Sequence, residues 1–145
     1  MKNIVESKME NLKIPLNKAL DDKVGVVELK VYDSNPNMNS IDEANMSKIS
    51  DSKFRERVES VALEQMIDMF NGENIDFLKM DCEGCEYKVL RGLPEYYFYK
   101  ILNINIEYHH ECQDIQEILK KQGFHTDIFK RDNISGYITA TRLTF

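Results

Sequence analysis

The sequence predicts an α/β fold with a mostly parallel sheet and an antiparallel hairpin at its C-terminal end. Three observations predict this class. A short apolar strand over 75–80 runs directly into a helix start, a second strand over 100–108 follows that helix, and a further amphipathic helix leads into strand patterns over 126–129 and 137–143. Strands that alternate with helices favour parallel pairing through right-handed crossovers. The chain has 145 residues, which fits one domain over 1–145.

The N-terminal half carries weaker signals. Val27, Leu29 and Val31 alternate with charged residues, which is typical of a half-buried strand. The helical face further on is formed by Leu63, Met66, Ile67 and Phe70. In chain order we expect a short helix over 3–12, an extended piece over 13–16, a strand over 24–32, a polar connection over 33–52, an extended piece over 58–61 and a helix over 63–70.

The junction after the strand over 75–80 holds the densest group of chemically active side chains. Asp81, Glu83 and Glu86 lie at or just inside a helix N-terminus, where the helix dipole favours anions. The helix is expected to end at Arg91, with Gly92 in the left-handed position that follows. The three acids can be ordinary helix caps or functional groups, and the pattern alone leaves both readings open.

The second half of the chain alternates with a period of two along 100–108. One face is strongly apolar, whereas Asn103 and Asn105 lie on the other face, beside a partner or as hydrogen-bonded amides. Asp114 and Glu117 have the spacing of a capping box for the next helix, and Gly123 marks its stop. The run Tyr96–Tyr99 can cover the edge of the core or line an acceptor pocket, and we expect the former.

The segment 75–92, IDFLKMDCEGCEYKVLRG, resembles the signature of FkbM-type methyltransferases. That signature is a hydrophobic strand, then Lys-x-Asp-x-Glu-Gly-x-Glu, then a helix that ends in Leu-x-Gly. Segment 104–109, INIEYH, is similar to the family's next strand with its terminal Glu and His, and 136–142 is similar to its closing strand. Further similar segments lie upstream, at 17–20, 24–31 and 39–40. The resemblance implies a partial doubly wound, Rossmann-like methyltransferase fold.

The resemblance to this family also implies S-adenosylmethionine as the cofactor. Methyltransferases of this kind hold it with a glycine-rich turn after the first strand and an acid after the second. The six glycines of this chain are scattered singly. We therefore expect a single FkbM-like domain over 1–145 that is truncated at its N-terminal side, and weak or no binding of S-adenosylmethionine by this chain alone.

Four polar side chains form the candidate site. The carboxyl ends of adjacent parallel strands face one crevice, so Asp81 and Glu83 should lie near Glu107 and His109. Methyl transfer needs alignment of the acceptor and removal of its proton. By resemblance, Asp81 would position the acceptor or, with Glu83, the cofactor, and His109 or Glu107 would handle the proton. Alternatively, His109 and His110 are solvent-facing residues at the strand end.

Three cysteines without a secretory signal predict reduced thiols rather than a disulfide framework. Cys82 and Cys85, together with His109, His110 and Cys112, are residue types that bind zinc and could form a zinc site. A redox-active pair of Cys82 and Cys85 is a further alternative. We expect Cys82 and Cys85 to be small packing residues and therefore predict no metal site.

Composition excludes several kinds of partner. A net charge of −6 without clustered Lys and Arg argues against nucleic acid, and no apolar stretch is long enough for a membrane helix. We expect a cytoplasmic protein that acts on a small-molecule or sugar-like acceptor, as a homo-oligomer or with a complementing chain. Its function would be O-methyl transfer, with a catalytically silent partner-binding module and a zinc-binding module as alternatives.

Overall fold

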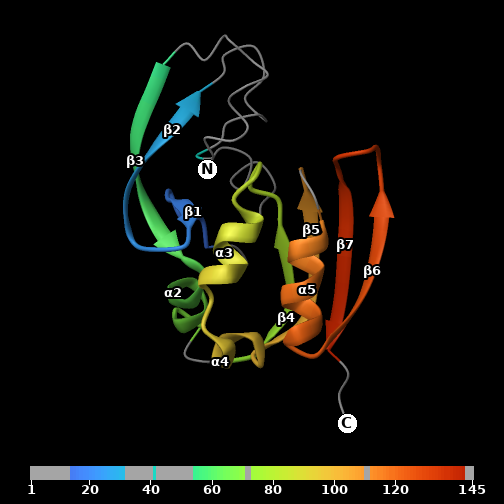
Figure 1. The fold of residues 1–145 in the computed structure, drawn as a ribbon. Helices are drawn as coiled ribbons and strands as arrows, with labels where there is room; N and C mark the ends of the chain where they lie inside the picture. The colour runs from blue at the N-terminus through green and yellow to red at the C-terminus, as the bar shows by residue number, and fades with distance from the viewer. Residues whose placement is uncertain (1–13, 32–40, 42–53, 71–72, 110–111, 143–145) are drawn as a thin grey trace, which may run out of the picture.

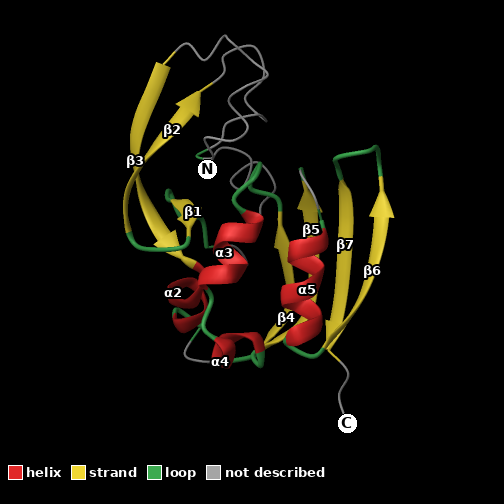
Figure 2. Ribbon diagram, viewed as in Figure 1, coloured by secondary structure: helices red, strands yellow, loops and turns green. Residues whose placement is uncertain are grey.

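The structure is a computed structural model that describes residues 14–31, 41, 54–70, 73–109 and 112–142. Two sheets and four short helices make up the described part (Figures 1 and 2). The elements are β1 (Ala19–Asp21), β2 (Gly25–Val31), β3 (Phe54–Ala62), α2 (Leu63–Asp68), β4 (Ile75–Met80), α3 (Glu86–Gly92), α4 (Glu95–Phe98), β5 (Ile101–Tyr108), α5 (Gln113–Lys121), β6 (Phe124–Lys130) and β7 (Gly136–Arg142). The helix expected over 3–12 and nearly all of the connection over 33–52 lie outside the described residues.

Both sheets are mixed, so the expectation of a mostly parallel sheet is wrong. The four-stranded sheet has the order β4-β5-β7-β6, in which only β4 and β5 are parallel. The three-stranded sheet has the order β1-β3-β2, with β1 parallel and β2 antiparallel to β3. The C-terminal hairpin was predicted correctly, but its second strand, β7, is the one that pairs with β5. Antiparallel pairs therefore outnumber parallel ones.

The four-stranded sheet has one helix-covered face. In Figure 1, α3 and α5 both lie in front of this sheet, and the two helices contact each other. The registers pair Leu78 with Ile104 and Met80 with Ile106, which places these apolar side chains on one face. The core that results is continuous from β4 to β7; its most buried members include Met80, Val89, Leu90, Phe98, Ile104, Ile106, Leu119 and Ile138.

Polar residues of β5 lie on the opposite face. Phe77 pairs with Asn103 and Lys79 with Asn105, and Asn103 donates a hydrogen bond from Nδ2 to the carbonyl of Asp76 at 2.9 Å. Asn103 is thus a bonded amide, one of the two possibilities left open by the sequence. Among the described residues, α3 and α5 cover the apolar face of β5, which accounts for its period of two, whereas a doubly wound sheet has both faces covered.

Helix α3 connects the two sheets. Lys88 donates a hydrogen bond from Nζ to the carboxylate of Asp21 at 2.6 Å, and Asp21 is only 1% exposed at the end of β1. A Cβ at Gly92 would lie 3.0 Å from Cβ of Asp22, so a glycine lets the helix approach β1 closely. The left-handed conformation expected at Gly92 is wrong, because Gly92 is the last helical residue and Leu93 is extended.

Helix α5 begins earlier than predicted. Its N-cap is Cys112, which makes no side-chain cap hydrogen bond, so the capping box expected at Asp114 does not form. Asp114 instead lies in the first turn, where its negative charge interacts favourably with the helix dipole. Gly123 has φ +83° and ends the helix as predicted.

Aromatic residues of α4 close the lower end of the core. Phe98 is buried, whereas Tyr96 and Tyr99 are exposed, as expected for a run that covers the core edge. The guanidinium of Arg142 on β7 donates to the carbonyls of Phe98, at 2.5 Å, and Gln122, at 3.0 Å. These hydrogen bonds hold β7 against the C-terminal ends of α4 and α5.

No helix in the described ranges is long and apolar enough to cross a membrane.

Candidate functional site

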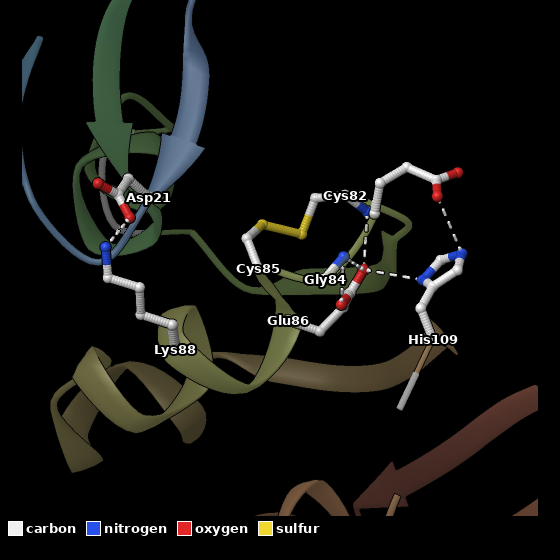
Figure 3. Close-up of a disulfide and its surroundings, with 8 residues drawn as sticks. Asp21, Cys82, Gly84, Cys85, Glu86, Lys88 and His109 are labelled. Atoms are coloured by element: carbon white, nitrogen blue, oxygen red, sulfur yellow. Dashed lines mark hydrogen bonds and ion pairs between the residues drawn. A yellow bond between two sulfur atoms is a disulfide. The ribbon is translucent and has the colours of Figure 1, made fainter. Parts of the chain in front are cut away.

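The candidate site is built on the turn between β4 and α3 (Figure 3). Glu83 has φ 55° and Gly84 has φ 111°, and within the described residues Glu83 is the only non-glycine residue with positive φ. L-residues adopt this conformation rarely and at a cost of about 1–2 kcal/mol. Contacts of the surrounding groups must therefore hold the turn in place.

A disulfide closes this turn. Cys82 and Cys85 are bonded to each other, with their Cα atoms 5.6 Å apart. The expectation that these cysteines are reduced is therefore wrong, although both pack as expected, Cys85 within the core and Cys82 against it. The sequence did not reveal the bond, because the turn between the two cysteines has two residues with positive φ, one of them a glutamate, for which this conformation is rare. Cys112 is a buried free thiol. A disulfide also offers no thiolates to zinc, and the zinc alternative loses two of its ligands.

Glu86 stabilises the turn from inside. Its side chain is 2% exposed, and its carboxylate accepts hydrogen bonds from the backbone N–H groups of Cys82, at 2.9 Å, and Gly84, at 3.0 Å. Burial acts to raise the pKa of Glu86, but the contact with His109 and these backbone donors outweigh it and lower the pKa. Glu86 is therefore a buried, ionised carboxylate at neutral pH.

His109, just after β5, lies between two acids. Its Nε2 is 3.4 Å from Oε2 of Glu83, and its Nδ1 is 3.7 Å from Oε1 of Glu86, an ion-pair distance longer than a hydrogen bond (Figure 3). The contact with Glu86 raises the pKa of His109, burial opposes this, and the charges of Glu83 and Asp81 add to the rise. Burial in turn raises the pKa of Glu83, although the charge of His109 opposes that shift.

Asp81, Glu107 and His109 meet at the carboxyl ends of β4 and β5. One side-chain oxygen or nitrogen of each lies within 4.8 Å of the others. Asp81 is exposed and its Oδ2 is 3.2 Å from Nζ of Lys79. Glu107 forms an ion pair with Arg131, whose guanidinium also lies over the ring of Tyr137 at 5.2 Å.

The structure thus brings together all four residues predicted for the site, Asp81, Glu83, Glu107 and His109. Their proposed roles stay predictions. Two neighbours were missed as site residues, Glu86 and Arg131. Glu86 was identified only as an acid at the helix start, and its signal is the second Glu of Glu-Gly-x-Glu. Arg131 has no local signal, because the pairing of Glu107 with Tyr137 brings it here.

The described residues make only part of a site for S-adenosylmethionine. Asp81 has an exposed carboxylate that can accept hydrogen bonds from hydroxyl groups. The backbone N–H groups of Cys82 and Gly84, however, are already bonded to Glu86. Among the described residues the remaining glycine with positive φ, Gly123, lies after α5. These two amides of the β4–α3 turn are therefore not free to bind the methionine carboxylate.

The fold and the site define an α/β protein with its polar groups at the carboxyl ends of two adjacent parallel strands, which is where such proteins bind ligands. The sequence model of the Methyltransferase FkbM domain matches residues 2–126, a range that includes β4, α3, β5 and α5. The chain belongs to the FkbM methyltransferase family. No curated protein and no solved structure matches it.

Proposed function

We propose that this chain carries the acceptor side of an S-adenosylmethionine-dependent O-methyltransferase, and that a complementing cofactor-binding half supplies the donor side. The observation that carries the proposal is the meeting of Asp81, Glu107 and His109 at two adjacent strand ends in a member of a methyltransferase family. The acceptor would be a small molecule or a sugar-like compound with a hydroxyl group. S-adenosylmethionine, when bound, would supply an electrophilic methyl group.

His109 is the best-placed base for the acceptor hydroxyl. One of its ring nitrogens lies within 4.8 Å of side-chain oxygens of Asp81 and Glu107, and Glu83 and Glu86 lie beside the ring at ion-pair distances. The negative charges of Glu86 and Glu83 raise the pKa of His109. The neutral imidazole is therefore a stronger base, but below that pKa most His109 side chains are protonated and cannot accept a proton. We therefore expect methyl transfer to accelerate as the pH rises through the pKa of His109.

Asp81 and Glu107 have different surroundings and hence different proposed roles. The carboxylate of Asp81 is exposed, so it can accept a hydrogen bond from the acceptor hydroxyl and align it for in-line displacement. Glu107 is paired with Arg131, which holds its carboxylate in place. Glu107 is therefore better suited to orienting neighbours than to removing a proton.

The test supplies the donor side as a fusion. The first strands and glycine-rich turn of a full-length FkbM-family member are placed before residue 1, and formation of S-adenosylhomocysteine is measured with a panel of sugars and other hydroxyl compounds. Asp81→Asn should lower the rate about a hundredfold or more, because an aligning carboxylate is lost. Stability should change by about 1 kcal/mol or less. The chain without the fusion should bind S-adenosylmethionine weakly or not at all by calorimetric titration.

Asp76→Asn is the matched control, since Asp76 is exposed on the same strand at its other end. It should leave the rate unchanged. A fusion that folds and binds S-adenosylmethionine, yet transfers methyl equally fast with Asp81→Asn and with His109→Gln, would rule out the assigned roles. A large loss of melting temperature in Asp81→Asn with full activity per folded molecule would make Asp81 a structural cap.

A second candidate function, a catalytically silent partner-binding module, is favoured by one observation. Strand β4 is an edge of its sheet, and beside it lies a cavity of about 460 Å³ with mainly apolar walls from α2, β4 and β5. Phe77 and Phe70 on its rim are 60% and 47% exposed. Apolar residues at a free strand edge are typical of surfaces that pair with another chain. The complementing half of the first proposal would use the same edge.

A further inference from the structure

The disulfide between Cys82 and Cys85 encloses part of the candidate site. The two residues inside the ring are Glu83, whose carboxylate contacts His109, and Gly84, whose N–H donates to Glu86. The N–H of Cys82 itself is the second donor to Glu86. A covalent change at these sulfurs therefore acts on both acids that hold His109 (Figure 3).

The two cysteines differ in accessibility. Cys85 is 3% exposed and packs in the core, whereas Cys82 is only partly buried. Cys82 is therefore the more accessible of the two residues to an external thiolate. This asymmetry suits thiol–disulfide exchange, which needs one reachable sulfur and a leaving thiolate.

The turn depends on closure by this bond. Glu83 adopts φ 55°, a conformation that L-residues rarely hold without restraint from their surroundings. Opening the disulfide removes the covalent restraint, so that non-covalent contacts, among them the hydrogen bonds to Glu86 and the contact of Glu83 with His109, must hold the turn. The turn can then relax, and the carboxylate of Glu83 moves away from His109.

We infer that Cys82 and Cys85 form a reversible redox switch that sets the contacts of His109. A thiolate of a dithiol reductant attacks the sulfur of Cys82, the disulfide breaks, and Cys85 leaves as a thiolate that takes up a proton. The second thiol of the reductant then attacks the mixed disulfide and releases Cys82 as a thiol. The reductant becomes a disulfide and the protein gains two electrons and two protons; oxidation reverses both steps.

The effect on methyl transfer rests on the proposed function, but the switch itself does not. Its readout is the titration of His109, which faces Asp81, Glu83, Glu86 and Glu107, with Arg131 on the far side of Glu107. In the dithiol form the contacts with Glu83 and Glu86 loosen. The midpoint of the His109 titration should then move to lower pH, whether or not the protein transfers methyl groups.

The experiment compares one protein in two redox states. Purified protein is equilibrated in buffers of reduced and oxidised dithiothreitol, and alkylation under denaturing conditions followed by mass measurement counts the thiols. The imidazole signal of His109, assigned by its loss in His109→Gln, is titrated by NMR in both states. We expect one thiol per chain in the oxidised form, three in the reduced form, full reversibility, and a lower His109 midpoint after reduction.

Two variants serve as controls. Cys112→Ser should keep the switch, because this free thiol lies outside the ring. The double variant Cys82→Ser, Cys85→Ser should show the lower midpoint in both buffers. Three free thiols under oxidising buffer, or equal His109 midpoints in the two states of the wild type, would overturn the inference. Both results come from the unmodified protein, so a variant that fails to fold does not decide the outcome.

Discussion

At the scale of single residues, Gly136 shows how tightly a position can be constrained. A Cβ there would lie 2.6 Å from the hydroxyl of Tyr108 and 2.9 Å from Cα of Lys130, and it would also strike the carbonyl oxygen of Phe129. Two of these obstacles are backbone atoms of the hairpin partner, which cannot give way as a flexible side chain can. Glycine is required at this position by space rather than by backbone conformation.

Gly136→Ala should therefore destabilise the protein by about 1–3 kcal/mol, the range for forced overpacking. Urea unfolding followed by circular dichroism would measure the loss. Gly25→Ala is the control, because the nearest atom to a Cβ at Gly25 is Oγ of Ser60 at 3.8 Å. Equal stability of the two variants would contradict this explanation.

His109 should make stability depend on pH. Its pKa is raised above the ordinary value of 6.5 in the folded state, so its favourable contribution is complete below that value and is lost as the pH rises through the raised pKa. The difference in unfolding free energy between wild type and His109→Gln should therefore be largest below pH 6.5 and shrink as the pH rises through the raised pKa of His109.

Chemical denaturation across this range would measure the difference. His125→Gln is the comparison, because His125 is exposed on β6 with its ring 3.8 Å from Asp127. Its profile should parallel that of the wild type. A difference for His109→Gln that stays constant with pH would show that the contacts with Glu83 and Glu86 do not stabilise the imidazolium.

At the scale of elements, Lys88 holds α3 against the end of β1 through ion pairs with Asp21, at 2.6 Å, and Asp22, at 3.1 Å. Lys88 is half exposed, but its partner Asp21 is almost fully buried, so loss of the lysine leaves a buried carboxylate without its donor. This pair and the close approach at Gly92 hold α3 against β1 and so connect the two sheets.

Lys88→Met should cost about 1–3 kcal/mol, as expected when a buried acceptor loses its partner. Lys79→Met is the matched control: Lys79 is as exposed as Lys88, but its partner Asp81 is itself exposed, and such a pair contributes about 1 kcal/mol or less. Thermal unfolding of both variants would separate the two cases. Similar losses of stability in the two variants would mean that the burial of Asp21 does not determine the cost of losing its lysine partner.

At the scale of the whole molecule, the free edge of β4 should drive association. In the part of the chain that the structure describes, no further strand lies beside β4, and this edge with its apolar cavity favours pairing with a strand of another chain. We expect a dimer or larger species at high concentration by light scattering. Phe77→Lys, which adds a charge at the exposed rim, should shift the equilibrium to monomer. A strict monomer at every concentration would contradict the expectation.

Local patterns predicted much of this molecule. The strand over 75–80 was predicted from a short apolar run, and the strand over 100–108 from alternation, because successive side chains of a strand point to opposite faces. The meeting of Asp81 with Glu107 and His109 followed from one rule about parallel strand ends. The FkbM signature identified the family.

The tertiary structure decided what depends on contacts between distant segments. The mixed sheet arises because β7, and not β6, pairs with β5, and no local pattern states which hairpin strand lies inside. Arg131 reaches Glu107 through that same register. The Cys82–Cys85 bond and the burial of Glu86 depend on a turn whose left-handed residues include a glutamate, a conformation that sequence propensity disfavours. Sequence alone therefore determined that Asp81, Glu83, Glu107 and His109 approach one another, whereas packing and register brought in Glu86 and Arg131 and determined which of these groups bind one another.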